Sequence, residues 1–154
     1  MDVKHINPFI ESSQTVLKQI TSMDVELGKV YVKDSPYRSD RIMIIVGVTG
    51  EMRGQVALVM SVKNALELAT IMMGGIKAQV LNEISKSAVS ELCNMILGNT
   101  ATILFNRGIS IEITPPSTVM GDNIEVSTGN RKTVCIPLKL DAGIEISLDV
   151  SLED

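Results

Sequence analysis

Residues 42–48 are apolar on both alternating faces, and this run is the strongest constraint that the sequence places on the fold. The run is Ile-Met-Ile-Ile-Val-Gly-Val, short and rich in β-branched residues. A strand with apolar side chains on both faces has to be covered on both faces, so the run predicts a central strand. Thr49-Gly50-Glu51 has the composition of a turn, and residues 55–60 supply the antiparallel partner of a hairpin.

Apolar residues at helical spacing predict three helices, at about residues 7–22, 61–73 and 82–105. Asn7, Ser61 and Asn82 stand at the predicted starts, where their side chains can accept hydrogen bonds from first-turn N–H groups. Pro8 fits the first turn because its missing N–H is not needed there. Gly74-Gly75 is expected to end the second helix.

The remaining apolar stretches predict strands at about residues 25–32, 109–113, 133–140 and 144–152. Residues 117–132 are polar and contain Gly, and we expect them to hold at most a short hairpin around Asn130. The order is a helix and three strands, a connecting helix, then a helix and three strands. This pattern predicts an α+β fold: a mostly antiparallel sheet with helices packed on it, and a pseudo-two-fold repeat of helix plus three strands. No Pro-, Gly- or Ser-rich linker divides the chain, so residues 1–154 are expected to form a single domain.

The charge and the ring content exclude several classes of partner. The formal net charge is −4 at pH 7, so there is no overall basic field to attract phosphate backbones or anionic lipid. Two Phe, two Tyr and no Trp leave almost no aromatic surface on which bases could stack. We therefore expect a protein that binds neither nucleic acid nor a membrane.

Histidine and cysteine chemistry is restricted as well. His5 is the single histidine, so a Ser-His-Asp triad, a Cys-His pair or a His-based metal site would each have to include it. We expect no metal site in this chain. Cys93 and Cys135 lie in separate apolar segments and are expected to be buried thiols in a reducing compartment. The chain does not start with a signal peptide and no apolar run reaches the length of a membrane span, so the expected location is the cytoplasm.

One face of the third predicted helix differs from an ordinary solvated face. On a helical wheel at about 100° per residue, small and polar residues gather around Glu91, and a wide apolar stripe lies opposite. The face has no Lys or Arg, whereas a solvated helix face usually mixes charges of both signs. We call it the Glu91 stripe; its members are Ile84, Ser87, Glu91, Asn94, Met95, Gly98, Thr102 and Phe105.

The chemistry available to this stripe is limited. Asn94 has no useful pKa and cannot be a general base, but its amide can accept a hydrogen bond from a water and donate one to an anion. Glu91 could pair with a cationic group on a partner. Gly98 costs about 1 kcal/mol relative to Ala in a helix interior and would let another backbone approach closely. On spacing alone, Glu91 and Asn94 could also be ordinary polar residues on a hydrated helix.

The segment Ser87 to Asn94, followed by Pro116, resembles the signature of the CheC/CheX/FliY chemotaxis phosphatases. That signature is Asp or Ser, three residues, Glu, two residues, Asn, twenty-one residues and Pro, and all four positions match. The flanking residues 71–75, 94–99 and 113–116 resemble the CheX branch. The resemblance covers most of the chain and is strongest from about residue 42 to 120.

This resemblance implies a phosphatase that acts on the phospho-aspartate of CheY, a receiver protein. Asn94 would orient the attacking water, and Glu91 would pair with the receiver's active-site lysine. Ser87, Gly98 and Pro116 would support the motif. The resemblance implies that Mg²⁺ belongs to the receiver, with no cofactor in this chain, and that two copies of the chain form a homodimer through sheet edges.

A weaker match to the same motif lies in the first predicted helix. Glu11 and Gln14 have the spacing of the acid and the amide, and Pro36 follows Gln14 after 21 residues, but residue 7 is Asn rather than Asp or Ser. We interpret this match as a coincidence or a relic of a second site. The alternative functions for the whole chain are a non-catalytic module that binds a receiver and a structural component of the flagellar switch.

Overall fold

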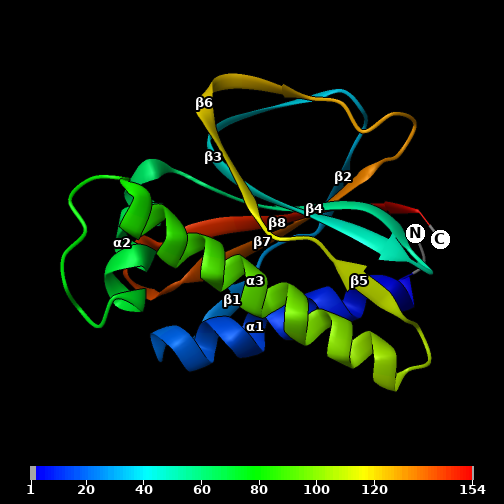
Figure 1. Ribbon diagram of the computed structural model, residues 1–154, viewed down its shortest axis with the longest axis horizontal. Coiled ribbons are helices and arrows are strands. Elements are labelled where there is room, and N and C mark those ends of the chain that lie inside the picture. The colour runs from blue at the N-terminus through cyan, green and yellow to red at the C-terminus, as the bar shows by residue number, and fades with distance from the viewer. Residues whose placement is uncertain (1–2, 154) are drawn as a thin grey trace.

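The computed structural model describes residues 3–153, and the side chains of all of these except 3 and 39–41. Three helices cover one face of a curled antiparallel sheet (Figure 1). The helices are α1 (Val3–Thr21), α2 (Val62–Met72) and α3 (Glu83–Asn106). The strands are β1 (Val25–Leu27), β2 (Tyr31–Lys33), β3 (Tyr37–Gly50), β4 (Arg53–Met60), β5 (Ile111–Ile113), β6 (Ser117–Val126), β7 (Thr133–Leu140) and β8 (Glu145–Glu153). The predicted α+β class is confirmed.

The sheet has a nearly symmetric order that reflects the predicted repeat. The strands follow the order β1-β7-β8-β4-β3-β5, with β2 also paired to β7 and β6 also paired to β3. The first repeat is α1 with β1–β4, the second is α3 with β5–β8, and the β4–β8 pair lies at the centre. The first strands are exchanged, because β1 and β2 pair with the second repeat's hairpin while β5 and β6 pair with the first. The sequence pattern had not indicated this exchange.

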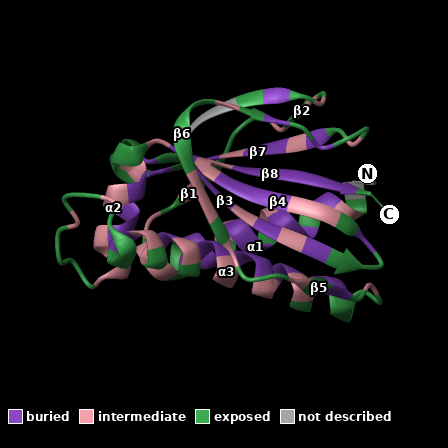
Figure 2. Ribbon diagram, turned by 45° about the horizontal axis from the view of Figure 1, so that its top comes forward, coloured by how far each residue is buried: buried purple, intermediate pink, exposed green. Residues whose placement is uncertain are grey.

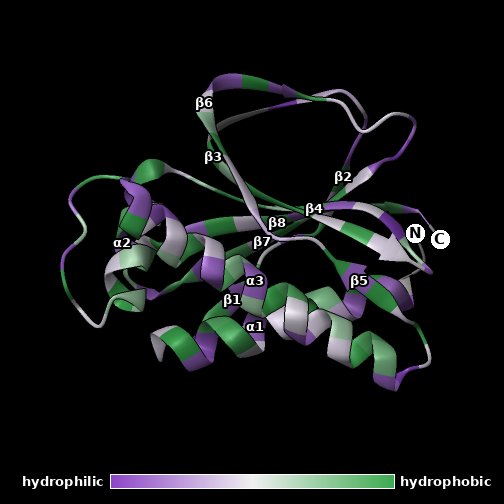
Figure 3. Ribbon diagram, viewed as in Figure 1, coloured by the Kyte–Doolittle hydropathy of each residue, from purple (hydrophilic) through white to green (hydrophobic). Residues whose placement is uncertain are grey.

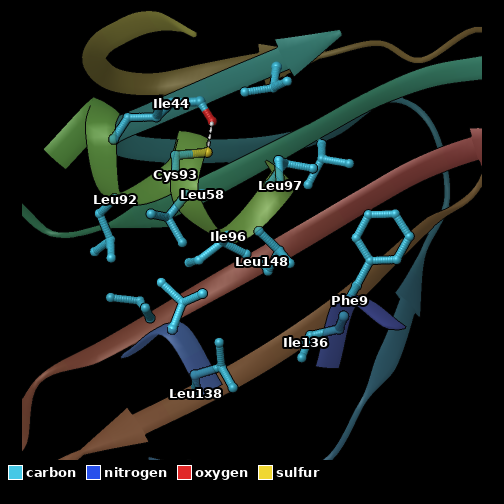
Figure 4. Packing of buried hydrophobic residues seen from close by; sticks show 14 of the residues in the cluster. Phe9, Ile44, Leu58, Leu92, Cys93, Ile96, Leu97, Ile136, Leu138 and Leu148 are labelled. Atoms are coloured by element: carbon cyan, nitrogen blue, oxygen red, sulfur yellow. Dashed lines mark hydrogen bonds between the residues drawn. The ribbon is translucent and has the colours of Figure 1, made fainter. Parts of the chain in front are cut away.

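The main core lies between the helices and the even-numbered residues of the four central strands. Ile44, Leu58, Leu148 and Ile136 form one row across the sheet, because each is the register partner of the next. All four are fully buried. Figure 4 shows this row facing apolar side chains of α3 and Phe9 of α1, and Figure 2 shows the buried side of each helix turned to the sheet. Aliphatic packing thus holds α3 firmly against the sheet.

The central strand predicted at residues 42–48 is confirmed, and both of its faces are covered. Ile42, Met43 and Ile44 are all 0% exposed. Beyond the sheet, β3 continues with β6 into an arm that arches over the face opposite the helices (Figure 1). Under this arm Met43 joins a second, smaller cluster with Tyr37, Ala57 and Val126.

The predicted N-terminal caps of α2 and α3 are confirmed, and each is formed by a side chain and a backbone N–H close together in the sequence. The Ser61 side chain accepts from Asn64 N–H at the start of α2. Asn82 and Ser85 form a capping box at the start of α3. Gly74 has a φ of +74° in the turn after α2, a conformation that favours glycine.

The predicted start of the first helix is wrong. Helix α1 already includes Val3, so Asn7 is an exposed residue within it and not a cap, and Pro8 lies inside the helix. Pro8 removes one backbone hydrogen bond from the helix. Burial of Ile6 and Phe9 on the side that faces the sheet offsets that loss.

Two strand predictions also need correction. Residues 25–32 form two short strands instead of one, with Gly28 between them donating its N–H to the Pro137 carbonyl at 2.9 Å. Residues 117–126, expected to hold at most a short hairpin, form the ten-residue strand β6. Residues 121–123 of this strand are exposed, and Figure 3 shows hydrophilic stretches along β6. Backbone pairing with β3, and not an apolar pattern, makes this segment a strand.

Candidate active site on helix α3

The register of α3 on the sheet determines which residues it presents outward. Of the predicted apolar stripe, Ile103 is only half-buried, and the buried members are Val89, Leu92, Cys93, Ile96, Leu97, Thr100 and Leu104. Ser12 of α1 donates to the Ile96 carbonyl at 2.6 Å, a buried hydrogen bond that ties the two helices together. With that side fixed, the Glu91 stripe faces away from the core. Figure 2 shows α3 buried toward the sheet and exposed on its outer side.

The structure places the predicted acid and amide together on this outer side. Glu91 and Ser87 are exposed, and Asn94 is half-buried one turn further along. Within residues 3–153, neither Glu91 nor Asn94 has a hydrogen-bond or ion-pair partner among the side chains that are described. Both groups are therefore available to a partner molecule.

Gly98 lies on the stripe one turn after Asn94 and is not required by packing within the chain. A Cβ atom built on Gly98 would meet no atom within 4 Å. The backbone is helical there, and the Thr102 hydroxyl donates to the Gly98 carbonyl at 3.2 Å. A glycine with free space around it leaves a shallow, backbone-lined place beside the amide of Asn94.

Strand β6 flanks the site through a contact that sequence reasoning missed. The hydroxyls of Ser90 and Thr118 lie 3.2 Å apart, within hydrogen-bond distance, and join α3 to the start of β6. After α3 the chain reverses and runs back along the helix. A strand advances about 3.3 Å per residue and a helix about 1.5 Å, so two residues of the strand span about four residues of the helix. Pro116, two residues before Thr118, is therefore expected about level with Asn94. No sequence signal distinguishes Ser90 or Thr118 from other hydroxyl residues.

The link that carries Pro116 is held in place by β3. Thr114 donates its N–H to the Gly47 carbonyl at 2.9 Å, and Gly47 N–H donates to the Thr114 Oγ1 at 2.8 Å. A Cβ at Gly47 would lie 3.1 Å from the Thr114 side chain, so glycine permits this close approach. The motif proline therefore sits on a rigid segment and not on a free loop.

The face of α1 that carries Glu11 and Gln14 is exposed to the same degree as the site on α3, but its carboxylate already has a partner within the chain. Glu11 is exposed and Gln14 half-buried, as are Glu91 and Asn94. However, Arg107 at the end of α3 binds the Glu11 carboxylate at 2.9 Å.

Pro36 does not complete a second motif. It follows β2, whereas Pro116 lies in the link between β5 and β6. In the first repeat the corresponding link is residues 28–30, between β1 and β2, and it contains no proline. Pro36 therefore does not take the place in the first repeat that Pro116 takes in the second.

The site is a convex surface and not a pocket. A hollow of about 1100 Å³ lies between α2, residues 75–79 and the turn at residues 142–144, and none of the Glu91 stripe lines it. In the described part of the chain, no group of three or more His, Cys, Asp or Glu side chains is arranged to hold a metal. This surface can present one carboxylate and one amide to a site on another molecule.

The two cysteines offer no accessible nucleophile. Both are free and buried, as predicted. Burial raises the pKa of the Cys93 thiol to about 12, and its Sγ donates weakly to the Ile44 carbonyl at 3.9 Å (Figure 4). His5 lies within α1. Nucleophilic chemistry by these side chains finds no support in the fold.

A second buried titratable group lies on the sheet face under the arm, away from the stripe. Asp149 is 3% exposed and accepts a hydrogen bond from the Ser147 hydroxyl at 2.6 Å. Burial raises the pKa of this carboxyl above its usual range, although the Ser147 hydrogen bond acts in the opposite direction. Cys135 is its register partner on β7. Burial, and then the Asp149 charge, raise the pKa of the Cys135 thiol to about 12.

Helix α3 is also long and apolar enough to cross a membrane by length and composition alone, with a mean hydropathy of 1.2. The expectation that no segment reaches this length is therefore corrected. Core helices of soluble proteins reach the same length and hydropathy. Here one side of α3 contacts α1, α2 and the sheet.

The fold and this helix face together define a chain of the CheC-like class. A CheC-like superfamily protein from a Shewanella species shares the architecture, with a TM-score of 0.85 and 25% identity, covering 100% of both chains. A family model described as chemotaxis phosphatase CheX matches residues 42–139. The chain therefore belongs to the CheX family of chemotaxis phosphatases, as the motif around Asn94 predicted.

Two further relatives show what this family includes. The CheY-P phosphatase CheX of Thermotoga maritima is 28% identical over 128 residues, which is 83% of each chain. The CheX–CheY–BeF3–Mg²⁺ complex from Borrelia burgdorferi contains a chain with a TM-score of 0.83 and 25% identity, covering 99% of this chain and 100% of that one. The family thus includes a phosphatase of phosphorylated CheY and a chain crystallised with CheY.

Proposed function

We propose that this chain is a phosphatase that hydrolyses the phospho-aspartate of a CheY-type response regulator in chemotaxis signalling. The observation that carries the proposal is the exposed, unpartnered Glu91–Asn94 pair on the convex face of α3, in a chain of the CheX family. A convex surface with two polar groups suits insertion into a partner's active site better than capture of a small substrate.

The chemistry assigned to Asn94 is orientation of water. Its amide oxygen accepts a hydrogen bond from the water, and its amide N–H groups can donate to a phosphoryl oxygen. The water oxygen attacks phosphorus in line, the bond from phosphorus to the aspartate oxygen breaks, and the proton from water leaves with the phosphate. Because an amide is not a base at neutral pH, the gain comes from positioning.

Glu91 is assigned the role of docking the receiver. Its exposed carboxylate lies one turn before Asn94 and has no cationic partner among the described side chains. A charge-assisted hydrogen bond to the receiver's active-site lysine would fix the orientation of the two proteins. The Mg²⁺ in this scheme belongs to the receiver.

Two other expectations stay predictions. A homodimer would form through the sheet edges, which here are the β1–β2 edge and the β5–β6 edge, and light scattering at micromolar concentration checks it. A cytoplasmic location is checked by cell fractionation.

The test is the decay of a phosphorylated CheY-type receiver with and without this chain. Asn94→Ala is expected to reduce the acceleration by about 10²–10⁴, the range for removing a group that assists the chemical step. Asn99→Ala is the matched control, because Asn99 is also half-buried on α3 but lies outside the stripe. Unchanged activity of Asn94→Ala would refute the assigned role, and binding of the receiver without faster dephosphorylation would favour the non-catalytic module.

A further inference from the structure

Two exposed apolar side chains lie at the ends of the Glu91 stripe. Ile84 is 66% exposed in the first turn of α3, and Phe105 is 69% exposed in its last turn. Phe105 is one of only two Phe in the chain, and the other, Phe9, is fully buried. A partner that covers these side chains would gain the free energy of burying them, so their place at the two ends of a functional surface makes them candidate contacts.

These two side chains are nearly in line with the catalytic face. Ile84, Glu91, Gly98 and Phe105 follow one another at intervals of seven residues. Seven residues are close to two helical turns, so the line drifts by only about 20° per interval. Each interval advances about 10.5 Å, and the four residues span about 32 Å along the helix.

That span matches the size of the proposed partner. A small domain is about 30 Å across. A receiver centred on Asn94 extends about 15 Å each way along the helix, and Ile84 and Phe105 lie about 15 and 17 Å from Asn94, at the two edges of such a domain. Between the ends the stripe holds one carboxylate and otherwise uncharged residues, and its largest side chain there, Met95, is half-buried and packs partly against the core.

We propose that Ile84 and Phe105 anchor the receiver domain and determine the affinity of docking, while Asn94 determines turnover. This inference rests on the proposed function. Apolar anchors bury area equally in the substrate complex and in the transition state, so they act on KM and not on kcat. A central polar pair with apolar contacts on either side also fixes the orientation of the helix in the partner's site.

The test measures binding and turnover separately. The probe for binding is a CheY-type receiver loaded with beryllofluoride and Mg²⁺, titrated by fluorescence anisotropy. Ile84→Ala and Phe105→Ala are each expected to weaken binding by about tenfold and to raise KM similarly, with kcat within about twofold of the unmodified chain. Both side chains are exposed, so the variants are expected to unfold at the same temperature as the unmodified protein.

Val32→Ala is the control. Val32 is 56% exposed on β2, at the opposite edge of the sheet from the strands that α3 contacts, and its removal is expected to leave binding unchanged. Unchanged binding in both Ile84→Ala and Phe105→Ala, alongside an inactive Asn94→Ala, would overturn the anchor proposal and leave the phosphatase proposal standing. An active Asn94→Ala would refute the role assigned to Asn94, and an unmodified chain that does not accelerate dephosphorylation would overturn the phosphatase proposal and this inference with it.

Discussion

Replacing Gly98 separates the stability of helix α3 from its function. Gly98 lies in the interior of a 24-residue helix, and a Cβ placed on it would meet no atom within 4 Å. Glycine is therefore unfavourable at this position for the isolated chain. We expect Gly98→Ala and Gly98→Leu both to make the protein more stable.

The magnitude follows from helix propensity. Ala and Leu are each favoured over Gly in a helix interior by about 1 kcal/mol, and the open surroundings of Gly98 add no steric cost. For a chain of 154 residues this corresponds to a rise in Tm of about 2–4 °C. The two variants should thus be nearly equal in stability while differing in bulk by three carbon atoms.

Their activities should differ. If the receiver's backbone approaches the helix beside Asn94, the methyl group of Gly98→Ala should change kcat/KM by less than about threefold, and the side chain of Gly98→Leu should lower it by at least tenfold. Thermal unfolding and the dephosphorylation assay on the same samples measure both effects. A Gly98→Leu variant as active as the unmodified chain would show that nothing approaches this position, and a Gly98→Ala variant of lower Tm would contradict the helical geometry.

Two further predictions concern groups away from the stripe. Because burial raises the folded-state pKa of Asp149, its contribution to stability is complete below about pH 4 and declines as pH rises through the raised pKa. Asp149→Asn should therefore flatten the decline of Tm with rising pH above about pH 4, and an unchanged slope would contradict the assignment. Gln14→Ala should leave the rate of dephosphorylation unchanged. Arg107→Ala removes the ion pair with Glu11; it should also leave that rate unchanged, and should lower the free energy of unfolding, measured with urea, by less than about 1 kcal/mol. A large loss of activity in Gln14→Ala would show that the α1 face takes part.

The parts of the fold that local chemistry decides could be predicted from the sequence. Ser61 and Asn82 cap helices because a side chain reaches an N–H two or three residues away. The run at residues 42–48 predicted a strand buried on both faces because no other environment suits it. The stripe around Glu91 followed from helical spacing alone.

The errors arise where distant segments decide the outcome. Strand β6 has no apolar pattern, and it forms because β3 extends far enough to pair with it. Pro8 stays within α1 because Ile6 and Phe9 are buried on both sides of it along the chain. The contact between Ser90 and Thr118 depends on the placement of β6 beside α3, so the sequence could predict the Glu91–Asn94 pair but not the strand that flanks it.

The exchange of first strands has a consequence for the smallest unit that can fold. Strands β1 and β2 find their partner only in β7, and β5 and β6 find theirs only in β3. A single repeat would leave its first strands unpaired, and would be complete only as an intertwined pair with a second copy. In this chain α2 and residues 73–82 tether the two repeats, so their association is intramolecular. Each repeat then meets the other at an effective concentration of the order of millimolar. A chain cut within this tether should therefore yield two fragments that fold only when mixed.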